Sequence, residues 1–284
     1  MLNKTFLLSA LMWAASGLSV QPLLAQSASV PTPTVQTWDL PHGTVVKDAG
    51  PRTYRFTVDY DTANATGDVV HRQRLTGDYT RGLANGDVEW RNVGVAEADG
   101  ATAPFPPAQK QDFIEGFHYP LGSPDTLKPD FFKSFPPSAV FERNLIWDTS
   151  MFESFGQNYF DQLKLNVPLH IPADQDVKMP DVGTFHTRDI VLEWVGRSQR
   201  NGQDCALIDY RAFFNPLQLA TGGVTIQGRS DFWGEIWVSL ATKQIEYATI
   251  YENVAGQLKL PNQDAPQPLS VFRIGTLEPL SPKN

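Results

Sequence analysis

Residues 205–214 read Cys-Ala-Leu-Ile-Asp-Tyr-Arg-Ala-Phe-Phe, and every even-numbered position in this stretch is apolar. That alternation predicts a β-strand whose even-numbered side faces a core. The odd-numbered side mixes residues such as Leu207 with residues such as Arg211, so it is not plainly polar. An antiparallel sheet with one solvent-exposed face alternates cleanly between apolar and polar residues. The stretch therefore predicts a sheet that needs cover on both faces.

Further strands are predicted on either side of this one, and the late ones repeat its mixed pattern. Asn201-Gly202 is a hairpin signal that joins it to the strand before it. We predict strands at 52–60, 68–79, 88–95, 189–197, 205–214, 224–232, 235–240, 244–252 and 270–277. Together they predict a single, mainly β domain at residues 44–284. Its fold is a curved antiparallel sheet, either an incomplete barrel or a sandwich, with one or two packed helices.

One convincing helix is predicted at about residues 150–165. Ser150 and Glu153 have the spacing of a capping box, and an aromatic stripe with helical spacing follows them. Gly156 weakens the middle of this helix, which suggests a close approach to the sheet. A short helix at 138–147 would precede it.

The segment 104–137 differs from the rest because it contains eight prolines. Proline cannot donate to a ladder, so we expect no central strand there, only a short one around 112–119. The segment also carries seven aromatic residues, and exposing that much apolar surface is unfavourable. We therefore expect a cap that packs down on the sheet.

The N-terminus has the features of a secretory signal peptide at residues 1–25, with Lys4 before an apolar run and a small residue at Ala25. Cleavage after Ser27 fits nearly as well. Residue 26 is Gln, so a lipoprotein acyl anchor has no cysteine to attach to. Residues 26–43 form a Pro/Thr-rich tether. The sequence thus predicts a periplasmic or secreted bacterial protein.

Composition excludes several partners. The chain of 284 residues has a net charge of −8, which disfavours a nucleic-acid binder. The mature part contains no apolar run long enough for a transmembrane segment. Cys205 is the single cysteine, so no intramolecular disulfide forms, and it is best interpreted as a small buried hydrophobe.

The sequence contains no recognised catalytic, metal or cofactor motif, and we assign no catalytic residue, metal ligand or cofactor. The five histidines lack zinc-ligand spacing, and no Gly-x-Ser-x-Gly, P-loop or Gly-x-Gly-x-x-Gly occurs. One alternative involves Trp233, Glu235 and Trp237, which lie on or beside the predicted late strands. Carboxylates flanked by aromatic rings can bind carbohydrate or hydrolyse glycosides.

The stretch from Gly228 to Glu252, with Gly234-Glu235-Ile236-Trp237-Val238-Ser239-Leu240 and the return Gln244-Ile245-Glu246-Tyr247, resembles the late hairpins of Lol-type periplasmic lipoprotein carriers and related exported bacterial proteins. The resemblance covers about 60 residues and includes no diagnostic motif. It implies an incomplete barrel of curved strands, closed by helices over an apolar cavity that takes acyl chains. This chain has one clear helix where that family has several.

These observations favour a non-enzymatic protein of the cell envelope that binds an apolar or lipid-like ligand between the sheet and its cap. Residues predicted to line the site are Phe117, Phe131, Phe132, Phe152 and Tyr159. One alternative is a carbohydrate-binding or glycoside-hydrolysing β-sandwich that uses Trp233, Glu235 and Trp237. A third is an envelope interaction protein without a small ligand.

Overall fold

The computed structural model describes residues 38–179, 182–221, 223–261 and 265–280. The predicted signal peptide at 1–25 and most of the predicted tether lie outside these ranges. The end of the tether does not: Leu40 is buried in the core and Trp38 packs against it. Ordered structure therefore begins before residue 44. No helix within the described ranges has the length and apolar character needed to cross a bilayer.

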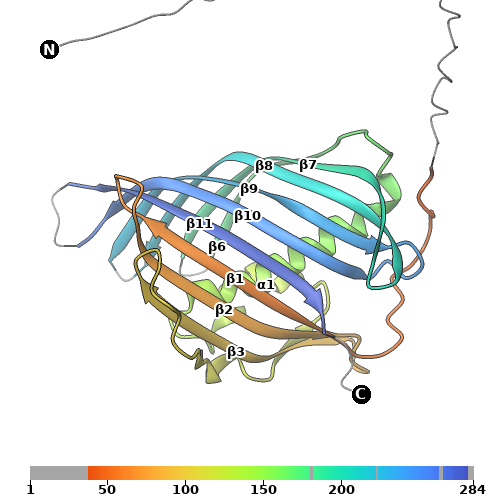
Figure 1. The fold of residues 1–284 in the computed structure, drawn as a ribbon, viewed down its shortest axis with the longest axis horizontal. Coiled ribbons are helices and arrows are strands. Elements are labelled where there is room, and N and C mark those ends of the chain that lie inside the picture. Colours follow the sequence, from red (N-terminus) through yellow and green to blue (C-terminus); the bar gives the residue numbers. More distant parts are fainter. Residues whose placement is uncertain (1–37, 180–181, 222, 262–264, 281–284) are drawn as a thin grey trace, which may run out of the picture. The chain divides into compact units, whose positions relative to one another are not determined.

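A single antiparallel sheet of eleven strands dominates the described chain (Figure 1). The strands are β1 (Arg52–Ala63), β2 (Val69–Arg81), β3 (Asp87–Asp99), β4 (Gln109–Lys110), β5 (Phe117–Pro120), β6 (Leu169–Met179), β7 (Gly183–Arg200), β8 (Gln203–Thr221), β9 (Val224–Ser239), β10 (Ile245–Lys259) and β11 (Gln267–Pro279). Their order is β4-β3-β2-β1-β11-β10-β9-β8-β7-β6, with β5 also on β3. The sheet is curved and does not close, which confirms the predicted mainly β fold. Of the two predicted forms, the single open sheet matches the incomplete barrel and not the sandwich.

Two strand predictions are wrong in detail. Residues 224–232 and 235–240 form one continuous strand, β9, because Gly234 stays in the ladder. A side chain at Gly234 would collide with the backbone carbonyl of Thr249, so the glycine serves close strand packing and makes no turn. The strand β6 was not predicted, because Pro172 and its polar neighbours obscure the alternation; it is an edge strand, where proline is tolerated.

The helix also begins earlier than predicted. α1 runs from Val140 to Glu153 and continues as a π-helical turn, η4 (Ser154–Asn158), and a 3-10 turn, η5 (Phe160–Gln162). Ser150 is therefore inside α1, where its hydroxyl donates to the carbonyl of Ile146 at 2.9 Å. Glu153 accepts from buried Arg81 at 2.8 Å, so the apparent capping box is absent. The two predicted helices at 138–147 and 150–165 are one.

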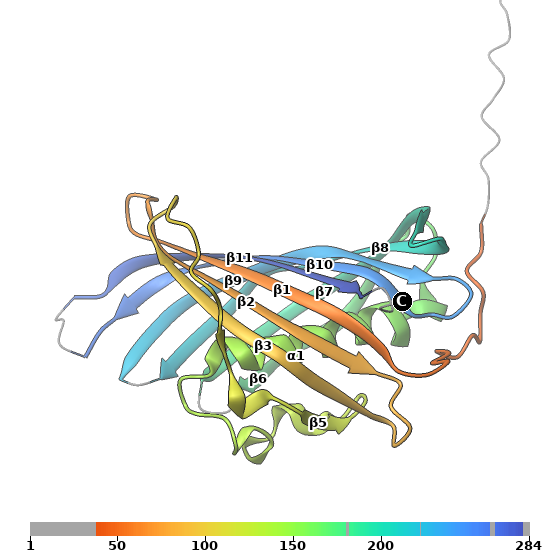
Figure 2. The ribbon, with the colours of Figure 1, turned by 60° about the horizontal axis from the view of Figure 1, so that its bottom comes forward.

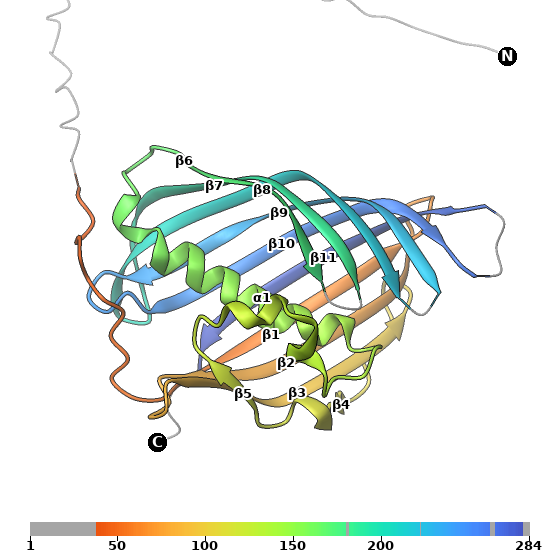
Figure 3. The same ribbon diagram turned by 180° about the vertical axis from the view of Figure 1, so that it is seen from behind.

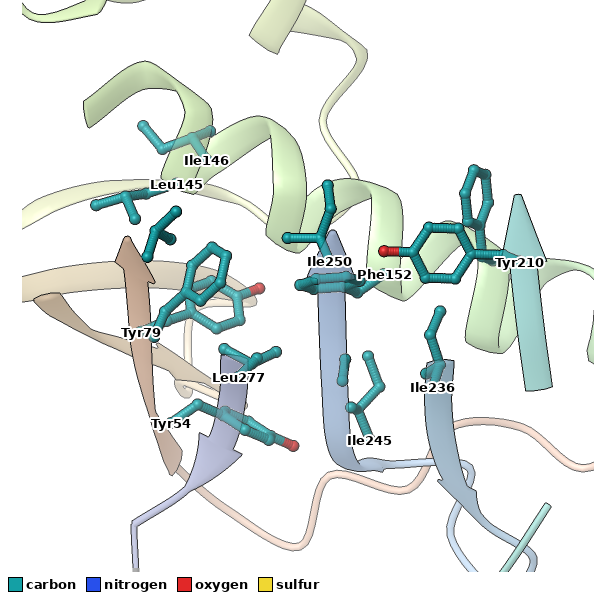
Figure 4. Close-up of a cluster of buried hydrophobic side chains, with 14 of the residues drawn as sticks. Tyr54, Tyr79, Leu145, Ile146, Phe152, Tyr210, Ile236, Ile245, Ile250 and Leu277 are labelled. Carbon is teal, nitrogen blue, oxygen red and sulfur yellow. The ribbon is translucent and has the colours of Figure 1, made fainter. Parts of the chain in front are cut away.

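α1 lies across the concave face of the sheet (Figure 3). Phe152 fills the space beneath it, with ring centroids 5.9 Å from Phe56 and 6.3 Å from Tyr210 (Figure 4). Gly156 marks the closest approach: a β-carbon there would lie 3.1 Å from methyl carbons of Ile236 and Val238. The predicted reason for this glycine, a close approach to the sheet, is confirmed.

The cap segment lies on the same side of the sheet as α1 (Figure 2). It contains three 3-10 turns, η1 (Asp112–Ile114), η2 (Pro124–Leu127) and η3 (Pro129–Phe132). At one end β5 pairs with β3, and η2 lies against β6, the opposite edge of the sheet. The cap thus bridges the two open edges of the incomplete barrel.

Filling the space beneath Gly156 should destabilise the protein. We expect Gly156→Leu to lower the free energy of unfolding by about 1–3 kcal/mol, because overpacking forces α1 away from β9. Urea unfolding measures this. Asn158→Leu, an exposed position in the same turn, is the matched control and should change little; equal losses in both variants would disprove the close-approach explanation.

Candidate functional site

A buried cluster of charged side chains joins α1 to the sheet near the place where the helix stops covering the concave face. The Arg273 guanidinium on β11 donates to both carboxylate oxygens of Asp148 on α1, at 3.0 and 3.1 Å. Its Nε lies 2.9 Å from the Glu252 carboxylate on β10. Glu252 in turn accepts from the Ser230 hydroxyl at 2.5 Å. This cluster fastens α1 to the middle of the sheet.

The cluster holds one arginine and two carboxylates, so it carries more negative than positive charge. Burial raises the pKa of Asp148 from 3.8 to about 6; the Glu252 carboxylate acts in the same direction, and Arg273 opposes it. Asp148 therefore keeps its proton to a higher pH than an exposed aspartate does.

Beyond this cluster, the strands continue past the end of α1 (Figure 3). One cross-strand row is formed by residues that pair in register from β7 to β11: Phe185, Leu217, Gly228, Gly256 and Leu269. The rows on either side add Ile226, Leu258, Val254 and Val271. We call these nine residues the apolar floor.

Leu217 of the apolar floor is buried, but other parts of the floor lie outside the packed core. Phe185 and Val271 contact the core cluster, whereas Ile226, Val254 and Leu258 do not belong to it. These three side chains remain partly exposed, while their outward neighbours Gln227 and Gln257 are exposed polar residues. The sheet therefore keeps strict inside-out alternation here without a described element filling the inside.

Two glycines form the centre of the apolar floor. Gly228 and Gly256 face each other across β9 and β10. A β-carbon at Gly228 would lie 2.6 Å from the α-carbon of Gly256, so no larger residue fits. The two glycines therefore leave bare backbone between the flanking Leu217 and Leu269, a feature typical of sites where another chain approaches the sheet closely.

Three predicted ligand residues are together, but in packed surroundings. Phe117, Phe131 and Phe132 contact one another edge to face, with centroids 5.5 and 4.8 Å apart. Phe135 and Trp147 complete the same aromatic cluster beneath the cap. Phe132 is fully buried there. The cluster anchors the cap to α1.

The other two predicted ligand residues lie elsewhere. Phe152 is buried between α1 and the sheet, away from the cap cluster. Tyr159 follows η4 and is partly buried against the core. The five residues therefore do not share one lining, and their role as ligand contacts stays a prediction.

The alternative site is on the opposite, convex face of β9. Trp233 is stacked on Tyr251, with centroids 6.0 Å apart and planes at 17°. Trp237 has the Arg200 guanidinium over its ring at 5.8 Å. One face of each tryptophan is thus already covered, which reduces the surface available for stacking on a sugar. Glu235 lies between them.

Glu235 does have acidic neighbours. It pairs in register with Asp209 on β8, which pairs with Glu193 on β7. Burial raises the pKa of Asp209, with Glu235 and Glu193 adding to the effect. Within the described ranges no group of His, Cys, Asp and Glu has the arrangement of a metal site. Cys205 is buried, as predicted, and burial raises the pKa of its thiol to about 11.

The sequence pattern did not predict the apolar floor, because the strand predicted at 244–252 ends before the part of β10 that contributes to the floor. The signal was present: Val224-x-Ile226-x-Gly228 and Val254-x-Gly256-x-Leu258 alternate with polar or small residues. Neither stretch has enough apolar residues to stand out, since glycine occupies one of the three inward positions in each stretch. Only the register of β9 and β10 brings the two glycines together.

No protein-family model and no curated protein matches the sequence. Among solved structures, one of lipovitellin ("Lipid-protein interactions in lipovitellin") aligns with 84% of this chain at a TM-score of 0.41 and 12% sequence identity. The aligned part is 26% of that chain, so this protein spans about a quarter of its length.

The buried charge cluster predicts a pH dependence of stability. Because the folded state holds the Asp148 proton more tightly than the unfolded chain does, ionisation between about pH 4 and pH 6 should lower stability by about 2–3 kcal/mol. Asp148→Asn removes this ionisation and its effect on the free energy of unfolding. We expect the stability of the wild type relative to Asp148→Asn to fall as the pH rises from about 4 to 7 in urea titrations; parallel profiles would show that Asp148 keeps its ordinary pKa.

Proposed function

We propose that the protein binds an apolar, lipid-like ligand on the concave side of its sheet, over the apolar floor. The observation that carries this proposal is the row Phe185, Leu217, Gly228, Gly256 and Leu269, which is apolar, faces inward and lies beyond the end of the α1 cover. A protein without such a ligand normally fills a concave apolar surface with its own side chains.

The chemistry of the apolar floor favours a hydrocarbon chain over a polar ligand. Its side chains are aliphatic or aromatic, and its two glycines allow van der Waals contact with the backbone. The polar groups at its edge are already engaged: Ser230 donates to Glu252, and Arg273 donates to Asp148. Ligand affinity would therefore come from burial of apolar area, about 0.8 kcal/mol for each methylene.

Binding of N-phenyl-1-naphthylamine, an apolar dye that fluoresces when it leaves water, tests the proposal. We expect saturable binding to protein purified without detergent. Ile226→Asp should weaken it at least about tenfold, because a carboxylate on the apolar floor must be desolvated. Gln227→Asp, the adjacent outward residue, is the matched control and should bind like the wild type.

Leu258→Asp and Gln257→Asp provide an independent pair on β10, each checked for folding by circular dichroism. Absence of saturable dye binding to the wild type, or equal losses in the inward and outward variants, would refute the proposed site.

We also propose that the protein acts after export, in the periplasm or the medium, on the basis of its N-terminal sequence. Intact-mass measurement of the protein secreted by a Gram-negative host checks this. The expected mature chain begins at Gln26, or at Ala28 if cleavage follows Ser27. A secreted or membrane-bound chain that retains residues 1–25 would contradict the proposal.

A further inference from the structure

The convex face of the sheet carries an exposed aromatic ridge that the proposed ligand site does not use. The ridge consists of Phe213, Phe214, Trp233, Tyr251, Phe272 and Ile274, which are between 38% and 59% exposed. They lie on four neighbouring strands, β8 to β11. Monomeric proteins seldom expose so many large apolar side chains together.

A β-bulge shapes the β8 end of the ridge. The bulge, between Ala212 and Asn215, turns two consecutive phenylalanines outward, and Phe214 has a φ of +59°, which is unfavourable for a bulky residue. Buried Asn215 holds the bulge by donating to the carbonyls of Ala212 and Ser230 at 3.0 and 3.1 Å. The sequence pattern had predicted Phe214 to face the core; the bulge reverses it.

The ridge has a positively charged residue at its β8 end and a negatively charged residue at its β1 end. One row reads Arg211 on β8, Trp233 on β9, Tyr251 on β10, Ile274 on β11 and Asp59 on β1. On β7, Arg211 pairs in register with Val191 and forms a diagonal ion pair with Glu193 of the neighbouring row, at 3.7 Å. Beyond Asp59 its partner is Arg74, at 2.6 Å.

This row is complementary to itself. A two-fold axis parallel to the strands over Tyr251 would place β8 of one chain against β1 of the other. Arg211 would then face the second copy's Asp59, and Trp233 would face its Ile274. Self-complementarity of this kind is what a symmetric dimer interface requires.

We propose that the aromatic ridge is a homodimer interface in which two copies of this chain pack the middle strands of their convex faces together. The position of the ridge suits such contact, because two convex surfaces meet only near their centres, and β10 and β11 are the middle strands of the sheet order. The proposal is independent of ligand binding on the concave face.

Light scattering after size exclusion, at protein concentrations up to about 100 µM, tests the proposal first. We expect a dimer mass, and Trp233→Ser should raise the dissociation constant at least about tenfold because it removes the central ring. Val45→Ser, which alters an exposed apolar residue outside the ridge, is the control. A monomer at every concentration, or a dimer that Trp233→Ser leaves unchanged, would overturn the proposal, and a monomer that floats with phospholipid vesicles would assign the ridge to a membrane instead.

A mixing experiment tests the symmetry. Arg211→Glu alone and Asp59→Arg alone should each weaken the dimer, because each places like charges at both ends of the interface. Mixed together, the two variants should form a heterodimer with opposite charges at both ends, visible by native mass spectrometry. Failure of the mixture to restore dimerisation would overturn the proposed pairing.

Discussion

The seating of α1 on the concave face is the contact on which the rest of the structure depends. Its central ring, Phe152, closes the core between Phe56 and Tyr210, and Gly156 lets the following turn touch β9. Two buried arginines, Arg81 and Arg273, fasten the helix from different strands. Buried ion pairs add little net stability, but breaking one leaves an unpaired buried charge. Moving the helix away from these arginines is therefore unfavourable.

The position of α1 divides the concave face into two parts with different properties. Where the helix lies, the inward side chains of the sheet form a filled core (Figure 4). Past the cluster around Arg273, the same strands continue with inward apolar residues and the glycine pair Gly228 and Gly256, but without that cover. A sandwich would have covered both parts equally. The open sheet, bridged at its edges by the cap, leaves one part without the cover of α1.

The sequence was sufficient to predict the mainly β class and most strand positions, because these follow from local alternation. It also predicted the role of Gly156, because that role follows from the small size of glycine. It was insufficient where a local pattern has two meanings. Ser150 and Glu153 have the spacing of a cap, yet Glu153 serves a long-range partner, Arg81. Phe214 continues an apolar alternation, yet a bulge held by Asn215 turns it outward. The candidate site depends on register between strands, which one sequence does not display.

Photo-crosslinking with a diazirine-bearing fatty acid shows whether the ligand lies on the apolar floor. After irradiation and proteolysis, we expect labelled peptides from β9 at residues 224–230 and from β10 at residues 254–259. Labelling confined to the cap at residues 104–137, or to the convex side chains around Trp233, would contradict this location.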